Sequence, residues 1–255
     1  MNYFFCIKSL NFNCKLTIPK FQNLGNLNKN NLLFQAKIKN NKWEIQKTKY
    51  TENKEFFFPN EDNCDNETIF FIAKDNEIEK YYEIRFSKLL KLNNFTETQP
   101  AFRSNLKIFN KAGGFSSYQS EYPFRMIERK FTILSPLSSL LNVKADYNKI
   151  FIKNIYQLPI KEKIDIYFIN YSLKKILKQV TAYTNFTNEI NIEKELIKSD
   201  VFLYMKPYGG IPLYVSVKNN HISFEHTHPP HEYIISHDKF IKVQELKDKF
   251  EEIIN

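Results

Sequence analysis

Residues 211–228 read IPLYVSVKNNHISFEHTH, and this stretch decides the fold class. Two runs rich in β-branched and aromatic residues flank Asn219 and Asn220, a pair that favours the positive φ angles of a two-residue hairpin turn. The predicted register pairs Val217 with Ile222, Val215 with Phe224, Leu213 with His226, and Ile211 with His228. Because side chains alternate along a strand, all eight share one largely apolar face.

Similar short runs recur along the chain. They are separated by segments rich in Asn, Lys and Asp that favour turns, at 22–31, 39–42 and 59–66. Residues 31–39 and 42–50 flank such a turn and predict a second hairpin. Further strands are predicted at 67–75, 80–88, 104–110, 130–134, 149–156, 163–171, 175–183 and 201–206. This pattern predicts a mainly β protein, an antiparallel sandwich or flattened barrel, with an α+β fold as the alternative.

Helix signals are few. In the last residues, apolar side chains recur at spacings of three and four and predict a C-terminal amphipathic helix. They are Val243, Leu246, Phe250 and Ile253. Shorter helices are predicted at 135–142, where Pro136 suits the first helical position, and at 192–200.

A break in the pattern near 98–103 divides the chain into two regions. Residues 1–100 form an N-terminal β-rich region, and residues 101–255 form a β-rich region with the histidines and the C-terminal helix. One continuous domain is the alternative, because 255 residues also suit a single large domain.

The composition disfavours several classes of protein. The net charge is +9, but the lysines are spread along the chain without a dense run, so a nucleic-acid partner is not expected. No run approaches the roughly 20 apolar residues of a membrane span, and no signal peptide is expected. Three cysteines, Cys6, Cys14 and Cys64, lack metal-ligand spacing and predict free thiols in a reducing, cytoplasmic setting. The sequence does not predict an oligomeric state.

All five histidines lie between His221 and His237. His226 and His228 are predicted to point to one face at the end of a strand, which Pro229 and Pro230 terminate. Neutral imidazole is a common ligand of transition metals. A divalent ion (Zn, Fe or Mn) is therefore predicted on His226, His228 and either His231 or Glu232. The alternatives are a metal-free pocket and neutral, hydrogen-bonded core histidines.

The spacing of His226, His228 and Glu232 resembles the first metal motif of the cupin barrels, which also carry His-x-His on a strand and a Glu a few residues later. The resemblance covers seven residues. The flanking glycines of that motif are absent, and only 23 residues follow Glu232, too few for the later strand that carries a cupin's last histidine. Membership of that family is therefore not inferred.

Doubled glycines mark a second region in a chain with only five glycines. Gly113-Gly114 opens a polar and aromatic stretch, 111–125, that reads as an ordered loop lining a site. Gly209-Gly210 precedes the histidine hairpin. With His228 as general base, the predicted catalytic partners are Tyr118, Tyr122 and Lys206, with Ser116 as a nucleophile. The predicted binding residues are Ser117, Gln119, Arg125, Glu225 and Tyr208.

These features predict a histidine-dependent enzyme, with or without a divalent metal, that acts on a small polar or anionic substrate such as a sugar derivative. Its site would join the 111–125 loop to the turn at 226–232. The alternatives are a non-catalytic β-sandwich module that binds a glycan or a protein through its many aromatic side chains, and a structural assembly subunit.

Overall fold

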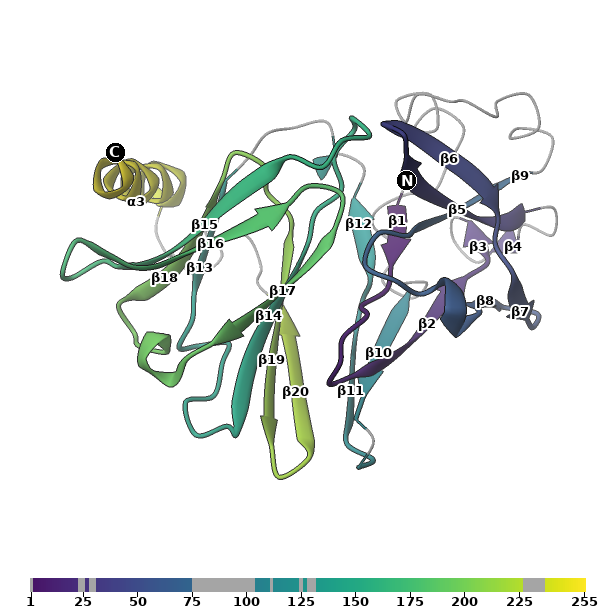
Figure 1. The fold of residues 1–255 in the computed structure, drawn as a ribbon, viewed down its shortest axis with the longest axis horizontal. Coiled ribbons are helices and arrows are strands. Elements are labelled where there is room, and N and C mark those ends of the chain that lie inside the picture. The colour runs from purple at the N-terminus through teal and green to yellow at the C-terminus, as the bar shows by residue number, and fades with distance from the viewer. Residues whose placement is uncertain are drawn as a thin grey trace. The chain divides into compact units, whose positions relative to one another are not determined.

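The computed structural model describes residues 2–22, 26–27, 31–74, 104–110, 112–123, 126–127, 132–226 and 237–255. The chain divides into two compact units (Figure 1). Unit 1 comprises Met1–Arg129, Ile155–Lys161 and Asn185–Thr187, and unit 2 comprises Lys130–Asn154, Glu162–Thr184 and Asn188–Asn255. The break predicted at 98–103 lies outside the described residues.

Unit 1 contains two five-stranded sheets and a two-stranded ribbon among its described residues. The first sheet has the order β12-β1-β9-β5-β6, the second has the order β11-β10-β2-β8-β7, and β3 pairs with β4. The elements are β1 (Asn2–Phe5), β2 (Asn13–Pro19), β3 (Phe21–Gln22), β4 (Asn26–Leu27), β5 (Asn31–Lys39), β6 (Lys42–Lys47), β7 (Tyr50–Glu52), β8 (Phe56–Pro59), the 3₁₀ helix η1 (Glu61–Asn63), β9 (Ile69–Lys74), β10 (Asn105–Phe109), β11 (Phe115–Tyr118) and β12 (Glu121–Pro123).

Unit 2 contains two four-stranded sheets, with the orders β13-β18-β15-β16 and β17-β14-β19-β20. The elements are β13 (Ile133–Pro136), β14 (Tyr147–Lys153), β15 (Lys163–Asn170), β16 (Lys175–Tyr183), β17 (Thr187–Ile192), the 3₁₀ helix η4 (Lys194–Leu196), β18 (Val201–Lys206), β19 (Ile211–Lys218), β20 (His221–His226) and the helix α3 (Lys239–Ile254). The hydroxyl of Tyr214 on β19 lies 2.5 Å from that of Ser135 on β13 and links the two sheets.

The prediction of a mainly β, antiparallel protein with a C-terminal helix is confirmed. The sequence predicted a sandwich or flattened barrel, and the described strands form four larger antiparallel sheets, two in each unit. No helix in the described part of the chain is both long and apolar enough to cross a membrane.

The two predicted hairpins are confirmed. Strands β19 and β20 pair Val217 with Ile222, Val215 with Phe224 and Leu213 with His226, as predicted. Asn219 and Asn220 have φ angles of 49° and 67°. Strands β5 and β6 turn at Asn40 and Asn41, with φ angles of 51° and 56°. Asparagine tolerates these left-handed angles, so both turns follow from local chemistry.

Several sequence predictions need correction. The helix at 135–142 is wrong, because Ser135 and Pro136 belong to β13 and pair with Leu203 and Phe202 of β18. The helix at 192–200 is limited to η4. The loop at 111–125 instead contains strands β11 and β12. The strand predicted at 80–88 lies outside the described residues.

The last helix packs on the sheet β13-β18-β15-β16 through a cluster of apolar and aromatic side chains. Phe250 is fully buried, and its ring centroid lies 5.9 Å from Tyr171, 5.7 Å from Phe202 and 5.6 Å from Tyr204. Leu134, Tyr167 and Ile169 complete the buried part of this cluster. The amphipathic face read from the sequence therefore covers the sheet.

Gly210 is required by close packing in unit 2. A Cβ atom at this position would collide with the backbone carbonyl oxygen of Lys153. The neighbouring carbonyl oxygen of Gly209 accepts a hydrogen bond from the Asn154 side chain. The doubled glycine thus marks a close approach of two backbones, as its rarity in this chain suggested.

Candidate ligand-binding cleft in unit 1

A cleft of about 470 Å³ opens on unit 1. Its size falls within the range of small-molecule sites, about 300–1,000 Å³. The lining combines carboxylates, an amide, a hydroxyl, an ammonium group and an aromatic ring. The lining residues are Lys15, Thr51, Phe58, Pro59, Asn60, Glu61 and Asp62.

Three paired strands and a 3₁₀ helix position these groups. Thr51 of β7 lies opposite Phe58 of β8 in the strand register. The chain then turns at Asn60, whose backbone N–H donates a hydrogen bond to the backbone carbonyl of Lys49 over 3.1 Å. The Asn60 side chain does not cap η1, so its amide is not used to begin that helix. Glu61 and Asp62 follow in the first turn and are exposed.

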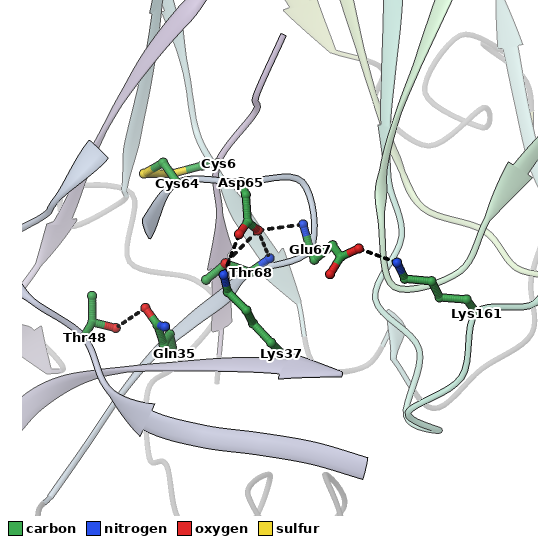
Figure 2. A network of polar contacts seen from close by, with 9 residues as sticks. All are labelled: Cys6, Gln35, Lys37, Thr48, Cys64, Asp65, Glu67, Thr68 and Lys161. Carbon is green, nitrogen blue, oxygen red and sulfur yellow. Dashed lines mark hydrogen bonds and ion pairs between the residues drawn. A yellow bond between two sulfur atoms is a disulfide. The ribbon is translucent and has the colours of Figure 1, made fainter. Parts of the chain in front are cut away.

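The segment after η1 is held by a dense network of polar contacts (Figure 2). Asp65 accepts hydrogen bonds from the backbone N–H groups of Glu67 (2.9 Å) and Thr68 (2.7 Å), and it pairs with Lys37 at 2.5 Å. Glu67 pairs with Lys161. Burial raises the pKa of Asp65, but the Lys37 and Thr68 hydrogen bonds outweigh it, and the net pKa is lowered.

Two further ties fix the same segment. Asn66 accepts a hydrogen bond from the backbone N–H of Lys8 and returns one to its carbonyl, at 2.7 and 2.9 Å. Cys64 forms a disulfide with Cys6, with the Cα atoms 5.2 Å apart. The prediction that all three cysteines are free thiols is therefore wrong for these two. The network anchors the backbone at the end of η1, the helix that carries Glu61 and Asp62.

The cleft is locally acidic in a basic chain. Glu61 and Asp62 supply two negative charges and Lys15 one positive charge. Within the described residues, neither carboxylate forms an ion pair with another side chain. Carboxylates make strong, charge-assisted hydrogen bonds to hydroxyl groups, and an aromatic ring such as Phe58 offers a face to apolar C–H groups. The arrangement favours a neutral ligand rich in hydroxyl groups over an anionic one.

No protein-family model, curated protein or solved structure matches this chain.

The predicted site residues of the 111–125 stretch lie in unit 1. Ser116, Ser117 and Tyr118 belong to β11, where Tyr118 pairs with Leu106 and Ser116 with Ile108 of β10. Gln119 follows that strand. Tyr122 belongs to β12 and is fully buried, and burial raises its pKa. Arg125 lies outside the described residues.

The remaining described candidates lie in unit 2. Lys206 ends β18, and its ammonium group pairs with Glu251 of α3. Tyr208 is buried, and Glu225 is exposed on β20. His226 ends β20 at the predicted register position. His228, His231 and Glu232 lie outside the described residues, so the predicted metal site and the composite site stay predictions.

Sequence reasoning missed both the cleft and two buried lysines. In unit 2, strand β19 lies between β14 and β20, and its Leu213 is paired with Phe151 on one side and with His226 on the other. Because side chains alternate along a strand, Lys149 and Lys153 of β14 lie on the same face of the sheet as Phe151. Lys153 is fully buried, and Lys149 pairs with Glu189. The sequence signal for these buried lysines is their position at 149 and 153, on either side of the apolar residues 150–152. For the cleft, the acidic 59–66 segment was interpreted only as a turn.

Proposed function

We propose that this chain is a non-catalytic binding protein whose unit 1 takes a neutral, polyhydroxylated ligand, such as a glycan, in the cleft beside η1. The observation that carries the proposal is the cleft of about 470 Å³ with two carboxylates, an amide and an aromatic ring in its lining. Hydroxyl groups would donate to Glu61 and Asp62, and Phe58 would contact the apolar face of a sugar ring.

The rigid setting of η1 supports a binding role. The disulfide and the Asp65 network hold the segment that follows Glu61 and Asp62. A site whose backbone is already ordered loses less conformational entropy when its ligand binds. The acidic lining argues against a phosphorylated or nucleic-acid ligand, although the chain as a whole carries a net charge of +9.

A glycan array probed with the full chain, followed by calorimetric titration of the strongest neutral hit, tests the proposal. Asp62→Asn removes a charged acceptor and should weaken binding about tenfold, because hydrogen bonds to charged groups contribute about 1.5–3 kcal/mol. Phe58→Ala should weaken it by a similar factor. Glu44→Gln, an exposed change on strand β6 outside the cleft lining, is the matched control and should bind like the parent chain.

Two results would contradict this function. One is the absence of any neutral glycan among the array hits. The other is a bound glycan whose affinity is unchanged in both Asp62→Asn and Phe58→Ala while circular dichroism shows each variant folded.

The histidine-dependent enzyme is the second candidate, and one observation favours it. His226 occupies the predicted strand end, on the sheet face that also carries the buried Lys149 and Lys153. Under this proposal His226 would act together with His228, His231 or Glu232, with or without a bound Zn, Fe or Mn ion. The substrate would be a small polar molecule such as a sugar derivative.

Elemental analysis of the purified chain separates the metal-dependent form of this candidate from the binding protein. Stoichiometric metal that is lost in a His226→Ala, His228→Ala double variant would support the enzyme. Metal that persists in that variant would place the ion elsewhere.

A cytoplasmic location also remains a proposal, and it requires that Cys6 and Cys64 be reduced in the cell, because disulfides persist mainly in oxidising compartments.

A further inference from the structure

All three cysteines of the chain meet inside unit 1. Cys6 follows β1, Cys14 lies in β2, and Cys64 follows η1. Their sulfur atoms lie within 4.8 Å of one another, and all three residues are buried. The disulfide uses two of these sulfurs and leaves the thiol of Cys14 buried beside them.

The disulfide accounts for only part of this arrangement. A bond between Cys6 and Cys64 ties two segments that are 58 residues apart, but it gives no reason for a third sulfur at the same point. A lone buried cysteine can act simply as a small apolar residue. Here every cysteine of the chain converges from a different element, which is how a protein assembles a thiolate metal site.

We propose that, once the Cys6–Cys64 bond is reduced, Cys6, Cys14 and Cys64 together bind one thiophilic d¹⁰ metal ion, Zn²⁺ or Cu⁺, as three thiolates. At a Zn–S distance of about 2.3 Å, two sulfurs on a tetrahedral ion lie roughly 3.8 Å apart, inside the observed spread of the three sulfurs. Within the described residues no histidine or carboxylate joins the group, so any fourth position on Zn²⁺ would take water or a small ligand.

Reduction of the disulfide and binding of the metal ion are two separate steps. A dithiol reductant gives two electrons and two protons to the disulfide, leaves two thiols on the protein and becomes a cyclic disulfide. The three thiols then release three protons as they bind a divalent ion. Burial raises the pKa of Cys14 to about 11, so its thiolate needs a neighbouring cation, and the bound ion would supply that charge.

The test uses the full chain, reduced with a dithiol and freed of reductant under anaerobic conditions. Co²⁺ is added as the spectroscopic probe, and Zn²⁺ is then added to displace it. We expect one ion per chain, a thiolate-to-cobalt charge-transfer band, and loss of that band when Zn²⁺ is added. A parallel titration with Cu⁺ shows which of the two ions binds more tightly.

Cys14→Ser is the decisive variant, because it removes the third sulfur and leaves the Cys6–Cys64 pair intact. Its affinity for Co²⁺ should fall by at least about 100-fold, since even changes outside the ligand shell cost about 10–100-fold. Leu16→Val, a core change on the same strand that keeps all three sulfurs, is the matched control and should bind like the parent chain. Circular dichroism checks that both variants fold.

The proposal is overturned if the reduced chain binds none of the three ions. It is also overturned if Cys14→Ser is folded and binds Co²⁺ as tightly as the parent chain. In either case Cys6–Cys64 is a structural disulfide, and Cys14 is an ordinary core residue.

Discussion

The hydroxyl of Tyr204 on strand β18 donates a hydrogen bond to the carboxylate of Glu251 on helix α3. The other oxygen of that carboxylate accepts from Lys206, so two neighbours on one strand hold one residue of the helix. The preceding residue of the helix, Phe250, is fully buried among the rings of Tyr171, Phe202 and Tyr204. Polar and apolar contacts therefore dock α3 at the same place.

This docking predicts that Phe250→Ala strongly destabilises unit 2. Removing a fully buried phenylalanine costs about 3–5 kcal/mol in the free energy of unfolding. Phe240→Ala on the same helix should change stability by less than about 0.5 kcal/mol, because Phe240 is 66% exposed. Urea unfolding followed by circular dichroism measures both. Equal effects of the two variants would show that α3 does not pack on the sheet through Phe250.

Asp65 predicts an acid-sensitive contribution to the stability of unit 1. Burial raises the pKa of this carboxyl, but hydrogen bonds from Lys37 and Thr68 outweigh it and leave the pKa lowered. A lowered folded-state pKa contributes stability above the unfolded pKa of about 3.9, and that stability is lost as the pH falls through the folded value. Asp65→Asn keeps the acceptor for Thr68 but loses the charge that faces Lys37.

We therefore expect Asp65→Asn to be about 1–2 kcal/mol less stable than the parent chain at pH 7. The difference should shrink as the pH falls below about 4. Urea unfolding at several pH values measures it, with Glu44→Gln as a surface control. A difference that stays constant between pH 7 and pH 3 would show that the Lys37–Asp65 pair does not contribute in this way.

The turn between β19 and β20 predicts that positions 219 and 220 tolerate Asn or Gly but not a β-branched residue. Asn219 and Asn220 both have positive φ angles, which cost a β-branched residue about 1–3 kcal/mol. Asn220→Val should therefore destabilise unit 2 by that amount, whereas Asn220→Gly should be nearly neutral. Lys218→Val, at an exposed strand position beside the turn, is the control. If thermal unfolding shows that Asn220→Val loses no more stability than Lys218→Val, the turn geometry is contradicted.

These turns also show what the sequence could predict. The Asn-Asn pairs and the alternation of apolar residues are local signals, and they gave both hairpins and the register of His226 correctly. The helix at 135–142 failed for the opposite reason. Pairing with Leu203 and Phe202, far along the chain, sets the structure of Ser135 and Pro136, and local propensity does not report that partner.

The candidate site was harder to predict for the same physical reason. Lys15 and Asp62 line one cleft, although they are 47 residues apart in the sequence. The cleft exists only once β2, β7 and β8 have paired. The composition of segment 59–66 predicts a turn between strands, which the structure has between β8 and β9, but it does not predict that the acidic residues line a cleft. The convergence of the three cysteines was equally invisible, because they follow no local spacing.

The link between Cys64 and η1 gives the last prediction, which rests on the proposed ligand site. The backbone N–H of Cys64 donates to the carbonyl of Glu61 over 2.9 Å, and the disulfide to Cys6 holds that end of the helix. Cys64→Ser should loosen Glu61 and Asp62, and ordering each of these side chains on binding costs about 0.5–1.5 kcal/mol.

In calorimetric titrations of the oxidised chain, Cys64→Ser should therefore bind the neutral glycan several-fold to about tenfold more weakly than the parent. Cys14→Ser keeps the disulfide and should bind the glycan normally. This pair of variants separates the two roles of the cluster, because Cys14 would matter for a metal ion in the reduced chain and Cys64 for the cleft in the oxidised one. Equal glycan affinity in Cys64→Ser and the parent would show that the network around Asp65 alone is enough to order η1.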